Sequence, residues 1–195
     1  MKNISDPTDA ANISDMVNGW MDHASLKWIF EEARKIPADE IIVEVGCWIG
    51  RSTTSLALAH PYPETLFVVD LFTGTLWDGH PECFDLPGGK NALEWFKENL
   101  MKFAGFLPQI IVGDSAESSQ NFGDKSVSFC FIDADHDYKA VKADIISWIP
   151  KIKDGGIISG HDFHHGPIQK ALNELFINTK IMSVNNSIWY VKMAH

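Results

Sequence analysis

The sequence contains few cysteines and no long apolar run. Its three cysteines, Cys47, Cys83 and Cys130, are scattered over 195 residues and form no C-x-x-C pair. Such a set predicts a reduced compartment, the cytoplasm, and argues against a disulfide framework or a zinc site. No run approaches the roughly 20 apolar residues that a membrane-spanning helix needs, and the N-terminus lacks the apolar core of a signal peptide.

Positive charge is also scarce. The chain has 16 Lys and Arg against 26 Asp and Glu, which gives a net charge of −10 and a pI of about 5.1. Because such a chain repels polyanions on average, we expect neither nucleic acid nor an acidic membrane as a partner. The predicted substrate is a small molecule. A homodimer is compatible with the sequence but not required by it.

The most informative stretch joins a strand, a glycine turn and a helix. Residues 41–45 are apolar and mostly β-branched, which predicts a buried strand. Glycines let a ligand approach the backbone, and a helix start offers unpaired N–H groups. We therefore expect Gly46, Gly50 and Ser52 to bind a ligand, with Glu44 facing it from the strand. The spacing G-x-x-x-G has no third glycine for a dinucleotide fingerprint and no Lys for a P-loop, so neither phosphate-binding pattern fits.

Two further strand ends carry acidic residues. The predicted strand 66–70 ends at Asp70, and in doubly wound folds an acidic residue at about this place binds ribose hydroxyls. The predicted strand 109–112 is followed by Asp114 and Ser115. Asp114 is expected to accept a hydrogen bond from an adenine amino group, to cap a short helix, or to do both.

Strands and helices alternate along the rest of the chain. Further strands are predicted at 127–132 and 157–159, and residues 180–191 are predicted to form a β-hairpin on a two-residue turn. This order predicts an α/β fold, with a doubly wound, Rossmann-like and mostly parallel sheet of seven strands that includes an antiparallel C-terminal hairpin strand. The whole chain, 1–195, is expected to form one domain.

Two segments outside the predicted sheet are less regular. Residues 1–12 are expected to be frayed, with short helices at 13–18 and 24–35. Between these helices, Trp20 and Met21 are expected to pack the helices together rather than to form a lid. The long insertion 71–90 either covers a substrate, through Trp77, His80 and Phe84, or forms a mobile surface loop.

Acidic residues and histidines gather at the ends of the predicted fourth and fifth strands. They are Asp133, Asp135, His136, Asp137, His161, Asp162, His164 and His165. Because ligands of open α/β sheets bind at the carboxyl ends of strands, we expect these groups to share a crevice with Gly46 and Asp70. Clustered carboxylates and imidazoles bind divalent cations, remove a proton from a hydroxyl, or hold loops together. From the residues alone, all three uses stay open.

These motifs together resemble the small class I O-methyltransferases that use S-adenosylmethionine (SAM). This group includes the caffeoyl-CoA, catechol and macrocin (macrolide-sugar) enzymes and the cephalosporin-hydroxylase-like proteins. The resemblance rests on E-x-G-x-x-x-G at 44–50, I-D-A-D-H-D-Y at 132–138 and G-G-I-I-S-G-H-D-F at 155–163. It covers the chain from about residue 19 onward. It implies methyl transfer from SAM to a hydroxyl of a small molecule, with or without Mg²⁺ or another divalent cation.

The resemblance also implies roles for individual residues. The implied cofactor contacts are Glu44, Gly46, Gly50, Ser52, Asp70, Asp114, Ser115 and Asp133. Asp133 and Asp162 match metal ligands, which we expect His161 to complete. Asp135 matches the general base of some relatives, and His136 is the second candidate base. The caffeoyl-CoA type has an Asn where this chain has Phe163, which cannot ligate a metal, so a histidine or water replaces it or no metal binds.

Two other functions share this architecture. One is an NAD- or nucleotide-sugar-binding oxidoreductase or epimerase, which the missing third glycine disfavours. The other is a SAM-binding module without catalysis. Such a module would not need the cluster of Asp133, Asp135, His161 and Asp162.

Overall fold

The computed structural model describes residues 4–73 and 86–194, and its strands form a seven-stranded sheet. The strands are β1 (Ile41–Val45), β2 (Leu66–Asp70), β3 (Gln109–Val112), β4 (Val127–Ile132), β5 (Ile152–Gly160), β6 (Met182–Val184) and β7 (Ile188–Lys192). Their order across the sheet is β3-β2-β1-β4-β5-β7-β6. Strands β1 to β5 pair in parallel, whereas β7 is antiparallel to β5 and β6. The predicted fold class is therefore confirmed.

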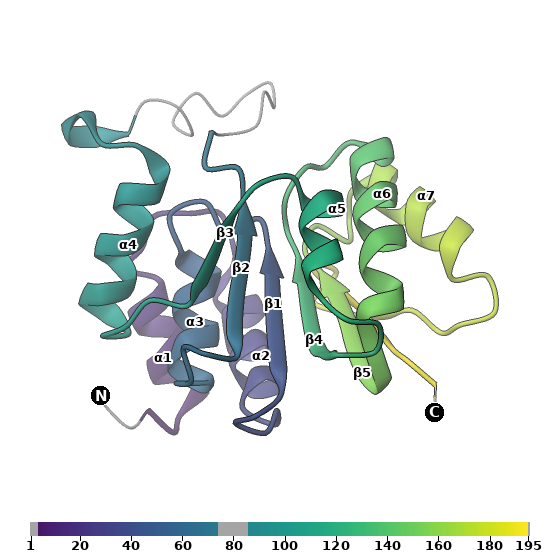
Figure 1. Ribbon diagram of the computed structural model, residues 1–195, viewed down its shortest axis with the longest axis horizontal. Helices are drawn as coiled ribbons and strands as arrows, with labels where there is room; N and C mark the ends of the chain where they lie inside the picture. Colours follow the sequence, from purple (N-terminus) through teal and green to yellow (C-terminus); the bar gives the residue numbers. More distant parts are fainter. Residues whose placement is uncertain (1–3, 74–85, 195) are drawn as a thin grey trace.

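Helices cover both faces of the sheet. They are α1 (Pro7–Ser14), α2 (His23–Ala33), α3 (Arg51–Ala59), α4 (Ala92–Phe103), α5 (Ser115–Ser118), α6 (Tyr138–Trp148) and α7 (Gly166–Leu175). Figure 1 shows α1 to α4 on one side of the sheet and α5 to α7 on the other. Successive residues of β1 alternate between the two cores: Ile42 packs with α2, α3 and α4, and Val43 and Val45 pack with α6 and α7. This burial on both faces explains why the strands are apolar throughout.

The N-terminal segment differs from the prediction. Helix α1 begins at Pro7 and ends at Ser14, so the chain is helical where fraying was expected, and the predicted helix at 13–18 is wrong. Asp6 caps this helix by accepting a hydrogen bond from the Thr8 N–H at 2.7 Å. Proline is favoured in the first turn because its missing N–H costs nothing there. Ala10 and Ala11 are fully buried, so burial against the neighbouring helices holds α1 in place.

Two C-terminal predictions also need correction. Strand β5 begins at Ile152 rather than at residue 157, because Ile152 already pairs with Val127 ahead of an irregularity in the ladder. The hairpin of β6 and β7 pairs Val184 with Ile188, so its loop has three residues, 185–187, and not two. Asn185 and Asn186 both have positive φ, 51° and 55°, a conformation that Asn tolerates better than most residues.

The sheet order reverses beside β1, whose neighbours are β2 and β4. At such a switch point the connections leave in opposite directions, and the crevice between them is the usual ligand site. Within the described residues, no helix is both long and apolar enough to cross a bilayer. The predicted substrate-covering residues Trp77, His80 and Phe84, and Cys83, lie outside the described residues.

Candidate functional site

A cavity of about 450 Å³ lies where β1, β2, β4 and β5 end. Its volume is in the range of small-molecule sites. Most of the residues predicted as site residues line it: Gly46, Ser52, Asp70, Asp114, Ser115, Asp133, Asp135, His136, His161 and Asp162. Glu44 and Gly50 do not line it. The crevice expected at the strand ends therefore exists, and it brings together groups that lie up to 116 positions apart in the sequence (162 − 46).

Asp70 holds the glycine turn in place. Its Oδ2 accepts hydrogen bonds from the backbone N–H groups of Cys47 and Trp48 at 2.7 and 2.8 Å, and its Oδ1 accepts one from Phe72 at 2.6 Å. Gly46 has a φ of +79°, and a Cβ there would lie 2.3 Å from the backbone oxygen of Asp133. Only glycine fits such an approach, so the loops after β1 and β4 touch at the floor of the cavity.

Glu44 and Gly50 support this turn from behind. Glu44 is fully buried and accepts a hydrogen bond from the Thr53 hydroxyl, which ties β1 to the start of α3. Burial raises the pKa of Glu44 to about 8, because the charged carboxylate would lose its hydration. Gly50 has a φ of +92°, and a Cβ there would lie 2.5 Å from Leu100 Cδ2. Both residues thus shape the turn without reaching the cavity surface.

The loop after β3 forms another wall. Asp114 caps α5 by accepting a hydrogen bond from the Glu117 N–H at 3.0 Å, so the capping role predicted for it is confirmed. Ser115 accepts a hydrogen bond from Trp148 Nε1 at 3.0 Å. Both residues line the cavity.

Asp144 on α6 is a cavity residue that the sequence analysis missed. Its carboxyl is nearly buried, and burial raises its pKa to about 6, with further increases from Asp114 and Asp135 and a decrease from a hydrogen bond to Ser115. The helical spacing of the sequence indicates that Asp144 is buried. Asp144 lies three residues after Val141 and four before Trp148, on the face of the helix that packs against the sheet.

The predicted cluster of acidic residues and histidines forms at the ends of β4 and β5. His136 Nε2 lies 2.8 Å from Asp162 Oδ2 and 3.7 Å from Asp133 Oδ1. His161 Nδ1 lies 3.3 Å from Asp162 Oδ1 and 3.8 Å from Asp133 Oδ1. The two carboxylates are therefore shared by two imidazoles. Asp162 has a φ of +56°, a left-handed conformation at the residue where the chain turns away from β5.

This sharing sets the charges of the cluster. Burial alone would lower the pKa of His136, but Asp133 and Asp162 outweigh it and raise that pKa to about 10. Burial would raise the pKa of Asp162, but hydrogen bonds from His136 and His161 hold it well below its usual range. At neutral pH the cluster therefore holds an imidazolium at His136 and a carboxylate at Asp162.

The other members of the cluster have separate environments. Asp135 lines the cavity, and its Oδ1 accepts a hydrogen bond from the Asp137 N–H at 2.8 Å. The side chain of His164 is about half exposed and lies 3.9 Å from Asp162, outside the cavity lining. Phe163 packs against the core on the side of α6 and α7, so it contributes no ligand atom. His161 also lies 3.0 Å from the Ser187 hydroxyl, a contact that the sequence analysis missed.

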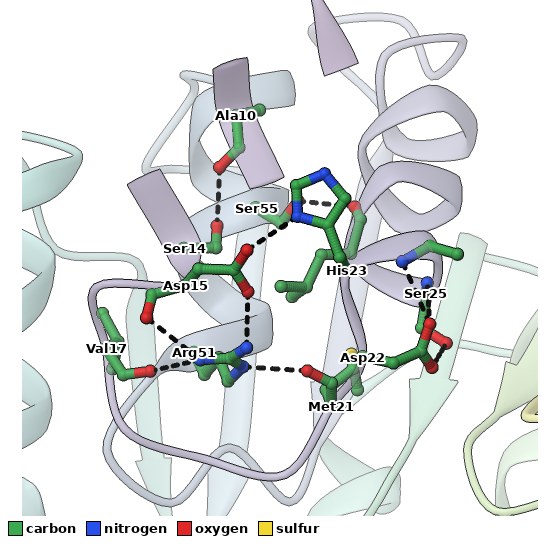
Figure 2. A network of polar contacts seen from close by, with 12 residues as sticks. Ala10, Ser14, Asp15, Val17, Met21, Asp22, His23, Ser25, Arg51 and Ser55 are labelled. Carbon is green, nitrogen blue, oxygen red and sulfur yellow. Dashed lines mark hydrogen bonds and ion pairs between the residues drawn. The ribbon is translucent and has the colours of Figure 1, made fainter. Parts of the chain in front are cut away.

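Arg51 fastens the segment between α1 and α2 onto the start of α3. Its Nε donates to the Met21 carbonyl at 3.0 Å, its Nη1 donates to the Val17 and Asp15 carbonyls at 2.7 and 3.3 Å, and its Nη2 pairs with the Asp15 carboxylate at 2.5 Å. Figure 2 shows these acceptors around the guanidinium. The fastened segment carries Trp20, which lines the cavity.

Trp20 and Met21 have different roles. Met21 is 5% exposed and packs in the core, as predicted. Trp20 is 52% exposed and stacks on Trp48, with ring centroids 4.7 Å apart and an interplanar angle of 27°. Because Trp20 is half exposed and stacks on Trp48 at the cavity, the prediction that it serves helix packing is wrong. The side chain of Trp20 stacks on Trp48 of the glycine turn and is not buried between the helices.

Comparison with known proteins agrees with this fold. A family model described as a methyltransferase domain matches residues 43–163. The TDP-rhamnose 3′-O-methyltransferase CalS11 of calicheamicin biosynthesis superposes with a TM-score of 0.60 at 17% identity, over 86% of this chain and 77% of its own. The O-methyltransferase NovP has a TM-score of 0.66 at 16% identity, over 89% and 81%. The SAH-bound methyltransferase PaMTH1 of Podospora anserina has a TM-score of 0.68 at 11% identity, over 98% and 89%.

We expect Asp144→Asn to raise the free energy of unfolding at pH 7 by up to about 3 kcal/mol, since one pKa unit corresponds to about 1.4 kcal/mol. The pKa of Asp144 rises from 3.8 when unfolded to about 6 when folded. The wild type is therefore most stable below the unfolded pKa and loses stability as the pH rises through about 6, whereas Asn does not titrate. Urea unfolding between pH 4 and 8 measures the gain.

The matched control for this experiment is Asp154→Asn, whose side chain is exposed. The control should change stability little at any pH. A stability gain at Asp144 that did not fade on acidification would contradict the raised pKa.

Proposed function

The chain belongs to the methyltransferase domain family, which matches more than half of its length, and we propose that it transfers a methyl group from SAM to a hydroxyl oxygen of a small molecule. The observation that carries this proposal is a single cavity at the switch point of the sheet. One end of this cavity has the glycine turn and Asp70, and the other has the cluster of Asp133, His136 and Asp162. A cofactor and an acceptor can therefore meet in one site.

The cofactor fits the end formed by β1, β2 and β3. The glycine turn leaves room for the methionine part of SAM, and Asp114 and Ser115 form the wall for its adenine. The carboxylate of Asp70 accepts hydrogen bonds from three backbone N–H groups. Since a carboxylate can accept about four hydrogen bonds, one position remains for a ribose hydroxyl. Glu44, behind the turn, serves the cofactor indirectly by fixing the start of α3.

The reaction needs an acceptor oxygen in line with the methyl group. The oxygen forms a bond to the methyl carbon as the carbon–sulfur bond breaks, and the hydroxyl proton passes to a base. Asp135 is the better base, because it lines the cavity and its Oδ1 accepts only a hydrogen bond from a backbone N–H, that of Asp137. His136 already carries a proton at neutral pH, since its pKa is raised to about 10. Holding the two reacting atoms together supplies much of the rate.

The carboxylates also fit a divalent cation. Ligand atoms of Asp133, His136 and Asp162 lie within 4.8 Å of one another, and His161 faces both carboxylates. Oxygen with imidazole ligands suits Mn²⁺ or another transition metal at least as well as Mg²⁺. Bound there, a cation would lower the pKa of the acceptor hydroxyl. Because ligating imidazoles must be neutral, the cation would displace the proton on His136.

Two rival functions have less support. Some NAD-dependent oxidoreductases use a catalytic Tyr and Lys with the spacing Tyr-x-x-x-Lys, and this chain has that spacing at Tyr138 and Lys142. These two side chains hydrogen-bond to Glu174 on α7 and do not line the cavity, so they are poorly placed for catalysis there. A SAM-binding module without catalysis leaves the cluster at Asp133 and Asp162 unexplained.

The remaining proposals concern the setting of the protein. Its partner is a hydroxylated small molecule, and the net charge of −10 makes nucleic acid and acidic membranes poor partners. Cys47 and Cys130 are buried free thiols, which supports a reduced compartment such as the cytoplasm. Light scattering at two protein concentrations would tell a monomer from a homodimer.

Calorimetric titration tests the proposed cofactor. SAM should bind one site per chain, and NAD should not bind. Asp70→Ala should weaken SAM binding by about 1–3 kcal/mol, the range for a lost hydrogen bond in a charged pair, with the loosened glycine turn adding to the loss. Asp154→Ala, on the exposed part of β5 away from the cavity, is the control and should bind SAM like the wild type. Tighter binding of NAD than of SAM would refute the proposal.

Turnover on an acceptor verified by SAH release tests the base. Asp135→Asn should lower kcat by about 10²–10⁴-fold, the usual contribution of a general base, while SAM still binds. Asp137→Asn is the matched control, because its side chain makes no capping bond although it precedes α6. If Asp135→Asn keeps full turnover, Asp135 is not the base.

Manganese tests the cation site without requiring turnover. Crystals soaked in Mn²⁺ should show one anomalous peak between Asp133 and Asp162, and Asp162→Asn should abolish Mn²⁺ binding measured by electron paramagnetic resonance. A wild-type crystal without a peak would show that the cluster binds only protons.

A further inference from the structure

The cavity is strongly acidic. Its lining includes six aspartates, Asp70, Asp114, Asp133, Asp135, Asp144 and Asp162. The cationic or titratable basic groups among the lining residues are Arg51, His136 and His161. Even with both imidazoles charged, six acidic groups face three basic ones. SAM has a net charge of +1 and suits such a cavity, whereas an acceptor with phosphate groups would be repelled.

Arg51 is not available to bind a phosphate. Its guanidinium already donates to the carbonyls of Asp15, Val17 and Met21 and pairs with the Asp15 carboxylate. Its side chain is 17% exposed. Binding an anion would require the guanidinium to break these contacts and release the segment between α1 and α2.

No lysine compensates for this. The lining of the cavity contains no Lys within the described residues. The undescribed segment 74–85 contains no Lys or Arg and has three acidic residues, Asp78, Glu82 and Asp85. Its basic side chain is His80, so it contains no permanently charged cation. Arg and Lys are the side chains that pair with phosphate groups, and the described lining of this cavity has only Arg51, which is already engaged.

The cavity has an aromatic surface formed by Trp20 and Trp48. Trp20 and Trp48 stack on each other at the cavity, and about half of Trp20 remains exposed. Arg51 fixes the segment that carries Trp20, and Gly19 permits its close approach, since a Cβ there would lie 2.7 Å from Arg51 Cδ. The indole is therefore a positioned surface, which favours ring-shaped apolar faces.

We infer that the acceptor is an uncharged hydroxylated ring compound whose ring packs on Trp20, and that phosphate-bearing acceptors such as nucleoside diphosphate sugars and CoA thioesters are excluded. This inference rests on the proposed methyl transfer and names the substrate class for it. Trp20 sets the specificity, and Arg51 is a positioning residue that acts through the segment it holds. A cation bound at Asp133 and Asp162 would offset two negative charges and leave four aspartates in the lining.

The test uses matched pairs of ligands on the full chain loaded with SAH, which prevents turnover. A panel of uncharged hydroxylated ring compounds, such as 4-hydroxyphenyl β-glucoside, is titrated by calorimetry beside the phosphate monoester of each. We expect at least one parent compound to bind and its ester to bind at least about tenfold more weakly at low salt. The difference should shrink at about 1 M salt, where the screening length falls to about 3 Å.

Variants of the aromatic surface complete the test. Trp20→Ala should weaken binding of the parent compound by about three- to tenfold, the size of a lost aromatic contact, and Trp20→Phe should restore most of it. Met16→Ala is the control, because Met16 is also exposed between α1 and α2 but lies outside the cavity lining. Arg51→Gln should reduce affinity for the ring without raising affinity for the ester.

The outcomes separate this inference from the proposed function. Failure of SAH itself to bind would refute the methyltransferase proposal. With SAH bound, an ester that binds as tightly as its parent, or a panel in which no uncharged ring compound binds, would overturn the inference alone. Unchanged ring binding in Trp20→Ala would remove Trp20 from the acceptor site.

Discussion

The contact between the loops after β1 and β4 is the constraint on which the site depends. Gly46 lies so close to the Asp133 carbonyl that no Cβ fits between them, and Asp70 holds the same turn from the other side through Cys47 and Trp48. The close approach fixes the distance between the cofactor end of the cavity and the carboxylate cluster. Since methyl transfer requires two atoms in line, a rigid floor between donor and acceptor is the feature that this chemistry needs most.

Carboxyl groups around this floor differ in charge because their surroundings differ. Burial of Glu44 raises its pKa to about 8, although hydrogen bonds from the hydroxyls of Ser52 and Thr53 lower it, so Glu44 is uncharged at neutral pH. Asp162 faces two imidazoles, which hold its pKa well below its usual range. The carboxyl group of Glu44 is therefore neutral and supports the glycine turn, whereas that of Asp162 is an anion. The fixed anions face the cavity, where a cationic cofactor binds.

Local patterns explain how much of this could be predicted from the sequence. The strands, the glycine turn and the carboxylates at strand ends follow from short motifs and from the rule that parallel strands end at one edge, and the structure confirms them. Other features depend on contacts between distant parts of the chain. Asp144 is buried because α6 lies beside α5, and Ser187 reaches His161 only because β7 pairs with β5. The helix expected at 13–18 is instead α1, which begins earlier because Asp6 caps it and Pro7 occupies its first turn.

The residues of the site lie partly inside and partly outside the range that matches the methyltransferase family. The family match covers residues 43–163, which include the glycine turn, Asp70 and the cluster at Asp133 and Asp162. Trp20 lies outside this range, on a segment joined to it through Arg51. The two parts meet through these hydrogen bonds, through the ion pair of Arg51 with Asp15 and through the stacking of Trp20 on Trp48. Under the proposed function, the sheet edge would supply the chemistry, and the α1–α2 segment would supply the acceptor choice.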